Sequence, residues 1–492
     1  MRRAGILLPL FSLPSPYGIG TMGQSARDFI DFLTKAGQSF WQVLPVGPTS
    51  FGDSPYQSFS SFAGNPYFID LDDLAAEGLL NPREYNTLDW GDSKAVDYAL
   101  LYQNRYPVLR KACQRLLGNI PADYTDFLAE HAFWLEDYAL FMSLKGSHGG
   151  QSWTRWEPEL RHRDPAAMAA ARAELAEEVS FWQAVQYLFY HQWDALKALA
   201  NEKGITIIGD LPIYVALDSA DVWADPQLFQ LDEHLAPTEV AGCPPDAFTA
   251  DGQLWGNPLF NWVRMAENGY AWWMRRIKFQ FRICDTLRID HFRGFDEYYA
   301  IPYGDSTARN GRWKTGPGKD FFHVLNETLG PRSIIAEDLG YLTQSVKELL
   351  AYTGYPGMKI LQFGFDSREP DSSYLPHCCP TNCVLYSGTH DNDTVVSWLN
   401  TITEEDRAYA IAYMRLTEAE GWHKGIARTI WSNTADLTIL QMQDILGLGN
   451  EARINTPSTL GCNWKWRLLP GQCSDTLARE LRTDMALYGR LP

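Results

Sequence analysis

The sequence predicts an α/β protein built on a parallel sheet, either open or closed into a barrel. Short β-branched runs, polar loops and helical patterns recur in that order along the chain, which is typical of βα units. No low-complexity tract, long linker or short-period repeat interrupts this order. A length of 492 residues suits an α/β barrel with insertions folded as one unit.

The predicted strands follow one another as short apolar runs. GILLPL opens the chain, and a helix with its apolar residues on one face is expected from about Gln24 to Ala36. SFWQVLPVG reads as the second strand. Five further runs read as strands: ITIIGDLPIYV, TLRIDHFRG, SIIAEDLG, MKILQFGFD and CVLYSGTHDND.

Two long segments read as helical. Residues 70–200, between the second and third strands, are too many for a loop and carry patterns such as EEVSFWQAVQYLFYHQWDALKALA. We interpret them as helical subdomains inserted into one catalytic unit that spans residues 1–492. The tail after about residue 400, including DRAYAIAYMRL and TADLTILQMQDIL, is expected to be helical and to complete the barrel.

Composition excludes several classes of partner. The formal net charge of −18 argues against nucleic acid or an anionic membrane, because a polyanion would be repelled.

The N-terminal MRRAGILLPLFSLPSPYG imitates a secretory signal, but Pro9 and Pro14 interrupt it and no small-x-small cleavage site follows. Eight scattered cysteines favour reduced thiols and a cytoplasmic protein.

Two short motifs have alternative interpretations. HCCPTNC, with His377, Cys378, Cys379 and Cys383, could form half of a metal site. Because no second paired cluster exists in the sequence, we expect unligated thiols and no metal.

YGIGTMG has its glycines at Gly18, Gly20 and Gly23, the spacing of a dinucleotide-binding turn. Such a turn needs an acid at the end of the next strand, about 20 residues after the last glycine. SFWQVLPVG ends without one, and Pro14 and Pro16 interrupt the preceding segment. We therefore reject a nucleotide cofactor.

Acidic residues end four of the predicted strands: Asp210, Asp290, Glu337 and Asp391. In a closed barrel these ends converge on one face, where the active site of such barrels lies. A single Asp there could be a helix N-cap. Four acids together, with His291 and His390 beside two of them, favour a catalytic site instead.

A pair of carboxyl groups across a substrate bond is the requirement of glycosidic chemistry. The candidates are Asp290 and Glu337, about 5 to 5.5 Å apart if the reaction retains configuration. Strand alternation places Arg288 on the same side as Asp290, where its charge is expected to keep Asp290 ionised as the nucleophile. Glu337 must start protonated, so its pKa must be raised. Asp391 would be a third acid that binds sugar hydroxyls.

The motifs around these acids resemble the conserved regions of the amylomaltases, the 4-α-glucanotransferases of the wider α-amylase superfamily. They are RIDHFRG, IIAEDLG and SGTHDND, and further matches run along the chain: SPYGIG, FGDSPYQSFSSFAGNPYFID, LEDYALFMSLK, IIGDLPIYV, ADVWADPQLF, AGCPPDAFTADGQLWGNPLFNW and GCNWKWR. The resemblance implies a (β/α)8 TIM barrel with inserted subdomains and no cofactor. It also implies transfer of α-1,4-glucan segments between malto-oligosaccharides, with glucose as an acceptor.

The same resemblance assigns roles to residues. Asp290 is implied as nucleophile, Glu337 as acid/base and Asp391 as transition-state stabiliser. Substrate-binding roles fall to the following residues: Arg288, His390, Asp210, His291, Tyr56, Phe248, Trp255, Asn257, Asn463 and Trp464. An insertion at about 225–280 would supply one wall of the site, through the loop 241–258, and the loop 455–466 a second wall.

Two other functions use parts of this pattern. An α-glucan hydrolase would use the same three acids, because transfer and hydrolysis differ only in whether a sugar or water attacks the intermediate. A non-catalytic glucan-binding protein would keep the aromatic residues without needing the acids and Arg288. The choice between monomer and homodimer stays open.

Overall fold

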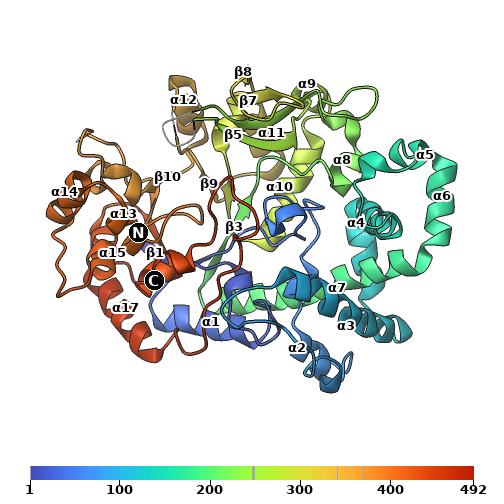
Figure 1. The fold of residues 1–492 in the computed structure, drawn as a ribbon, viewed down its shortest axis with the longest axis horizontal. Coiled ribbons are helices and arrows are strands. Elements are labelled where there is room, and N and C mark those ends of the chain that lie inside the picture. The colour runs from blue at the N-terminus through green and yellow to red at the C-terminus, as the bar shows by residue number, and fades with distance from the viewer. Residues whose placement is uncertain (1, 246–249, 341, 370) are drawn as a thin grey trace.

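The computed structural model describes residues 2–245, 250–340, 342–369 and 371–492. Eight parallel strands close into a barrel in the order β1-β12-β11-β10-β9-β6-β3-β2, which confirms the predicted (β/α)8 barrel (Figure 1). The barrel strands are β1 Arg3–Leu7, β2 Phe40–Gln42, β3 Thr206–Leu211, β6 Thr286–Ile289, β9 Ile334–Ala336, β10 Gly357–Ile360, β11 Cys383–Tyr386 and β12 Leu437–Gln441.

Helices surround this barrel and fill the insertions. Their bounds are α1 Gln24–Lys35, α2 Leu71–Ala76, α3 Tyr98–Gly118, α4 Tyr124–Ser147, α5 Pro158–Arg161, α6 Pro165–Glu174, α7 Ala176–Glu202, α8 Ala220–Ala224, α9 Trp262–Ala266, α10 Ala271–Ile283, α11 Gly318–Leu329, α12 Gln344–Thr353, α13 Val395–Thr401, α14 Glu404–Met414, α15 Trp422–Ser432, α16 Met442–Ile445 and α17 Asp475–Leu487. Among the described residues, none of these helices is both long enough and apolar enough to cross a bilayer.

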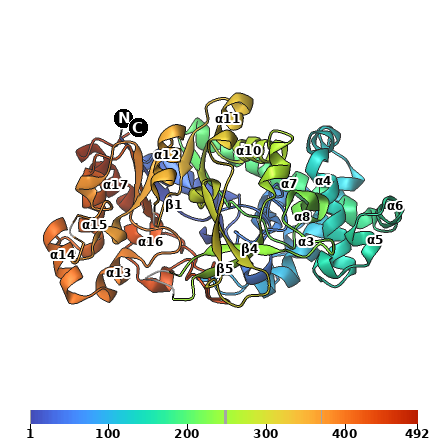
Figure 2. The same cartoon turned by 90° about the horizontal axis from the view of Figure 1, so that it is seen from above.

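Six helices, α2 to α7, come between β2 and β3 in the chain. Helices α3 to α6 lie at the blue-green end of the molecule in Figures 1 and 2, and α4 packs along α7. Aromatic side chains fill this packing: the ring of Trp134 lies 6.2 Å from that of Tyr190, and the ring of Tyr138 lies 6.1 Å from that of Trp182. The buried aromatic rings explain why the segment folds as helices against the barrel.

A second, antiparallel sheet lies beside the barrel, with strand order β5-β4-β7-β8. Its strands are β4 Glu239–Cys243, β5 Gln253–Pro258, β7 Glu297–Pro302 and β8 Arg312–Thr315. The first two belong to the connection between β3 and β6, and the last two follow β6. This sheet therefore carries β5, with Trp255 and Asn257, next to the carboxyl ends of the barrel strands.

The tail after residue 400 is not wholly helical, so that prediction was wrong for LTILQ. This run forms β12, whose five residues are all buried and which pairs with β1 on one side and β11 on the other. A short apolar run that is buried on both faces has no period that separates strand from helix. Its pairing with β1 also brings the two chain termini together (Figures 1 and 2).

The glycines of YGIGTMG serve close packing in the turn between β1 and α1. Gly18 adopts a φ of 79°. A Cβ on Gly20 would lie 1.9 Å from the Leu10 carbonyl oxygen, and one on Gly23 would lie 2.1 Å from Asp70 Oδ2. Glycine avoids these clashes, so close approach of the Leu10 backbone and of the Asp70 side chain explains the spacing.

We expect Gly20→Ala to lower the free energy of unfolding by about 2 kcal/mol or more, because the new methyl group overlaps backbone that cannot move away. Gly146→Ala is the control, since Gly146 lies in α4 and a methyl group added there would meet no atom within 4 Å. The free energy of unfolding of this control should rise by up to about 1 kcal/mol, because alanine has the higher helix propensity. Guanidinium unfolding measures both, and a Gly20→Ala protein as stable as the wild type would contradict the packing argument.

Candidate active site

Three carboxylates lie at the carboxyl ends of adjacent barrel strands. Asp210 is in β3, Asp290 directly follows β6, and Glu337 directly follows β9. The strand ladders continue through them, because the Asp290 N–H donates to Leu211 O at 3.0 Å and the Glu337 N–H donates to Ile289 O at 3.0 Å. Parallel pairing thus brings together the three acids, which the sequence had placed at strand ends.

Arg288 joins two of these carboxylates. It pairs with Asp210 across β3 and β6, and its Nη1 donates to Asp210 Oδ1 at 2.6 Å and Oδ2 at 2.7 Å. Its Nη2 lies 3.0 Å from Asp290 Oδ1, on the same side of the strand as predicted. Its side chain is only 5% exposed, so the guanidinium is a buried cation between two acids.

Backbone N–H groups hold the Glu337 carboxyl. His291 N–H donates to Oε2 at 2.6 Å and Leu339 N–H donates to Oε1 at 3.1 Å. His291 can do so because it adopts the left-handed conformation, with φ 52° and ψ 50°, directly after Asp290. This conformation costs free energy in a non-glycine residue. It lets the N–H group of His291, the residue after Asp290, donate to the Glu337 carboxyl.

Burial raises the pKa of both acids. That of Glu337 rises to about 7 and that of Asp290 to about 6, the neighbouring carboxylates adding to the effect of burial. The sequence predicts that Arg288 keeps Asp290 ionised. Arg288 lowers the pKa of both acids, but at Asp290 it does not outweigh burial together with the charges of Asp210 and Asp391. The pKa of Glu337 thus lies above that of Asp290, which is the order that an acid and a nucleophile need.

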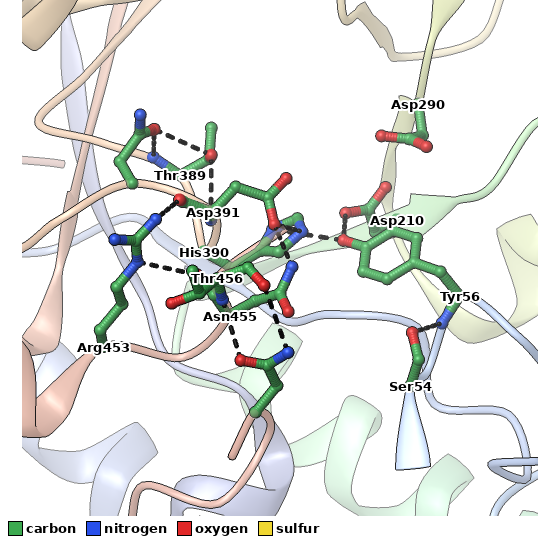
Figure 3. A network of polar contacts seen from close by, with 12 residues as sticks. Ser54, Tyr56, Asp210, Asp290, Thr389, His390, Asp391, Arg453, Asn455 and Thr456 are labelled. Carbon is green, nitrogen blue, oxygen red and sulfur yellow. Dashed lines mark hydrogen bonds and ion pairs between the residues drawn. The ribbon is translucent and has the colours of Figure 1, made fainter. Parts of the chain in front are cut away.

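Asp391 stands across from this group, but not at a strand end as predicted. It lies in the loop beyond β11, which ends at Tyr386. Its Oδ1 accepts a hydrogen bond from Asn455 Nδ2 at 2.6 Å and lies 3.3 Å from His390 Nε2 (Figure 3). Its side chain is 43% exposed, which leaves it open to a ligand.

Tyr56 connects the two sides of the site. Its hydroxyl donates to Asp210 Oδ2 at 2.7 Å and lies 3.3 Å from His390 Nδ1 (Figure 3). Its ring stacks on the His390 ring at 4.9 Å between centroids. Burial lowers the pKa of His390, so a neutral imidazole faces Asp391 at neutral pH.

Other predicted residues form a wall on the β5 side. The half-buried Trp255 meets the His291 ring edge to face, with centroids 4.9 Å apart. His291 Nε2 is buried and has no hydrogen-bond partner within the described ranges. Phe248 lies outside the described residues.

Three predicted residues are engaged by the protein itself. Asn257 Nδ2 donates to Val215 O at 2.8 Å, and its Oδ1 accepts from Gln57. Asn463 exchanges hydrogen bonds with the backbone of Thr456. Trp464 is 4% exposed and packs near Tyr56 and His390. These contacts favour a role in shaping the walls.

Sequence reasoning missed Arg453 and Asn455, which contact the loop of Asp391. Asn455 begins the segment NTPSTLGCNWKW, the loop 455–466 that the resemblance predicts as a second wall of the site. The sequence therefore pointed to this segment, but not to Asn455 itself. Nothing in the local sequence pattern distinguishes Arg453 from the other arginines of the chain.

The cysteine segment shows no grouping that could hold a metal: the described residues contain no cluster of three or more His, Cys, Asp or Glu side chains placed for one. His377 Nδ1 lies 2.8 Å from the Tyr413 hydroxyl. Cys379 Sγ and Cys383 Sγ donate to backbone carbonyls of Leu375 and Pro380.

Comparison with known proteins gives consistent matches over the whole chain. A family model described as 4-alpha-glucanotransferase matches residues 8–472. The 4-alpha-glucanotransferase of Clostridium butyricum is 49% identical over 484 residues, covering 97% of this chain and 99% of the relative. That of Thermus thermophilus is 46% identical over 506 residues, covering 100% and 99%.

Solved structures agree with these matches. The amylomaltase from Streptococcus agalactiae in complex with acarbose superimposes with a TM-score of 0.98 at 42% identity, covering 100% of both chains. The amylomaltase from Corynebacterium glutamicum superimposes with a TM-score of 0.78 at 20% identity, covering 100% of this chain and 75% of the other. The second likeness extends to the fold alone.

The raised pKa of Glu337 makes stability depend on pH. The pKa of Glu337 is about 7 in the folded protein and near 4.3 in the unfolded chain. Its contribution to the free energy of unfolding is therefore complete below about pH 4.3 and is lost as the pH rises to about 7. Glu337→Gln removes this loss. We expect the free energy of unfolding of the variant, relative to that of wild type, to rise by about 1 kcal/mol or more from pH 4.5 to pH 8.

Urea unfolding of both proteins at the two pH values measures this change. Glu159→Gln, at an exposed position of α5, is the control and should differ from wild type by less. An equal difference between Glu337→Gln and wild type at both pH values would show that Glu337 is not the titrating group.

Proposed function

The chain belongs to the 4-alpha-glucanotransferase family, and we propose that Asp290 and Glu337 carry out its glucan transfer by double displacement. Transfer moves α-1,4-linked segments between malto-oligosaccharides, with glucose among the acceptors. One observation carries the proposal: a buried carboxyl pair at adjacent strand ends, in which Asp290 contacts Arg288 and the pKa is about 7 for Glu337 and about 6 for Asp290.

In the first step, the Asp290 carboxylate attacks the anomeric carbon of the donor. The protonated Glu337 gives its proton to the glycosidic oxygen, so the reducing-end fragment leaves as an alcohol. The product is a glucosyl ester on Asp290. Arg288, at 3.0 Å from Asp290 Oδ1, orients the attacking carboxylate.

In the second step, Glu337 has become a carboxylate and acts as a base. It takes the proton of the acceptor's 4-hydroxyl, whose oxygen attacks the same anomeric carbon and displaces Asp290. Two inversions restore the α-linkage and return the proton to Glu337. His291 N–H and Leu339 N–H hold the Glu337 carboxyl in place during both proton transfers.

Positive charge develops at the anomeric centre in both steps. Asp391, partly exposed and 3.3 Å from a neutral His390, is placed to accept hydrogen bonds from sugar hydroxyls and to stabilise that charge. Asp210 and Tyr56 complete the polar surface of the subsite. The acarbose bound by the Streptococcus agalactiae relative supports an oligosaccharide ligand for this chain.

Transfer requires that a sugar reach the intermediate more often than water does. The half-buried Trp255 offers a flat apolar face, which the His291 ring supports from the side. We propose that these groups bind the acceptor sugar. A bound acceptor displaces water and holds its 4-hydroxyl at a high effective concentration next to Glu337.

The roles of the two acids separate on a donor whose leaving group needs no proton. On α-maltosyl fluoride, Glu337→Gln should release a burst of about one fluoride per enzyme and then stop, because the ester forms but no base activates the acceptor. Asp290→Asn should release none. On maltotriose both variants should lose at least about 10²-fold in rate.

A fluoride electrode measures the burst, and intact mass detects the maltosyl adduct. The wild type, which turns over continuously on the same donor, is the control. An adduct on Asp290→Asn and none on Glu337→Gln would mean that the roles are reversed.

The reaction itself is tested with maltotriose alone. We expect glucose and a ladder of longer chains, with almost no gain in reducing ends, because each cleaved bond is remade to a sugar acceptor. Chromatography of the products and a reducing-sugar assay on the same samples measure this, and a chelator should leave the rate unchanged. A steady rise in reducing ends without a ladder would identify an α-glucan hydrolase.

A further inference from the structure

The loop that carries His390 and Asp391 bonds to the barrel at its two ends, where Ser387 N–H donates to Ile439 O and Gln362 Nε2 donates to Asp393 O. It runs from the end of β11 to the N-cap of α13 at Thr394, without strand or helix. Within it, Asn392 Oδ1 accepts from the Thr389 N–H at 2.8 Å, and the Asp391 N–H donates to Thr389 Oγ1 at 3.3 Å. These contacts shape a turn, but they leave the Asp391 carboxyl free to rotate.

Arg453 fastens this loop to the segment that follows α16. Its Nη2 donates to the Asp391 carbonyl oxygen and its Nε to Asn455 O at 2.8 Å (Figure 3). Its Nη1 donates to Asp393 Oδ1. One rigid guanidinium therefore bonds to the backbone of Asp391, to an acid two residues later and to Asn455. Asn450 Nδ2 also donates to Asp393 Oδ1, at 3.0 Å.

Asn455 in turn fixes the Asp391 carboxyl. Its Nδ2 donates to Asp391 Oδ1 at 2.6 Å, and its N–H donates to His390 O at 3.0 Å. Arg453 holds the carbonyl of the same Asn455, so both ends of the Asp391 residue, its backbone and its carboxyl, depend on this pair. The side-chain contacts of Asp391 with Asn455 and His390 both fall on Oδ1, and its side chain is 43% exposed, so a ligand can reach the carboxylate.

We propose that Arg453 is a positioning residue for Asp391: it holds the Asp391 backbone directly and the Asp391 carboxyl through Asn455. The inference rests on the proposed function, in which Asp391 stabilises the transition state. Arg453 acts through these two residues rather than on the sugar. Its loss leaves the turn of Thr389 and Asn392 intact but lets the carboxyl leave its place.

The alternative is that Arg453 contributes only to folding. A purely structural role would lower stability and the amount of active enzyme, and it would not depend on whether residue 391 carries a carboxylate. A double-mutant cycle between Arg453 and Asp391 separates the two, because residues that act through one another give non-additive effects.

The experiment compares wild type, Arg453→Met, Asp391→Asn and the double variant, with transfer from α-maltosyl fluoride to glucose as the assay. Arg453→Met should lower kcat by about 10- to 100-fold, the cost of a misplaced catalytic group, with KM changed by less than about threefold. In the Asp391→Asn background the same substitution should change kcat by less than about twofold.

Arg428→Met is the matched control. Like Arg453, Arg428 pairs with a carboxylate: its Nε and Nη2 donate to Glu420 at 2.7 and 2.9 Å. It lies on α15, away from this loop. Its kcat should stay at the wild-type value. Thermal melting of all variants checks folding. Should Arg453→Met fail to fold, Arg453→Lys keeps the charge without the fork, and Asn455→Ala removes only the bond to Asp391 Oδ1; both should lower kcat in the same non-additive way.

Two results would overturn the inference: an unchanged kcat in Arg453→Met, or a loss that is equally large in the wild-type background and in the Asp391→Asn background. Full activity in Asp391→Asn alone would instead contradict the proposed role of Asp391. The two failures are therefore distinguishable in one set of measurements.

Discussion

A buried guanidinium between two carboxylates is the interaction on which the rest of the site depends. Arg288 is 5% exposed and Asp210 1% exposed, and they bond across neighbouring strands at 2.6 and 2.7 Å. Removing one partner from such a pair leaves an uncompensated buried charge, which is strongly destabilising. The pair therefore fixes the relative positions of β3 and β6, and with them the place of Asp290.

Asp290 and Glu337 lie near the same cation but have different direct partners. Burial raises the pKa of both groups, and Arg288 opposes it at both, but only Asp290 contacts the guanidinium directly at 3.0 Å. Glu337 has backbone N–H donors instead, one of them from His291 in a left-handed conformation. The two acids therefore differ in their direct partners, a guanidinium for Asp290 and backbone N–H groups for Glu337.

The opposite side of the site belongs to another part of the chain. Closure of the barrel by β12 places the segment after α16 beside the loop after β11, where the Gln441 N–H donates to Ser387 Oγ at 3.2 Å. Arg453 and Asn455 reach Asp391 from that segment, and Tyr56 connects His390 to Asp210. The two sides meet only because the barrel is closed.

The sequence by itself determined the βα order, the acids Asp290 and Glu337 next to Arg288, and the family resemblance, because strand alternation and strand ends are local properties of the chain. It failed at LTILQ, where a fully buried run has no distinguishing period, and at Asp391, which lies in a loop. Only the tertiary structure decided that the amides of Asn257 and Asn463 bond to the protein, and that Arg453 and Asn455 hold Asp391. These contacts join residues far apart in the chain, and barrel closure, not local pattern, sets which of them meet.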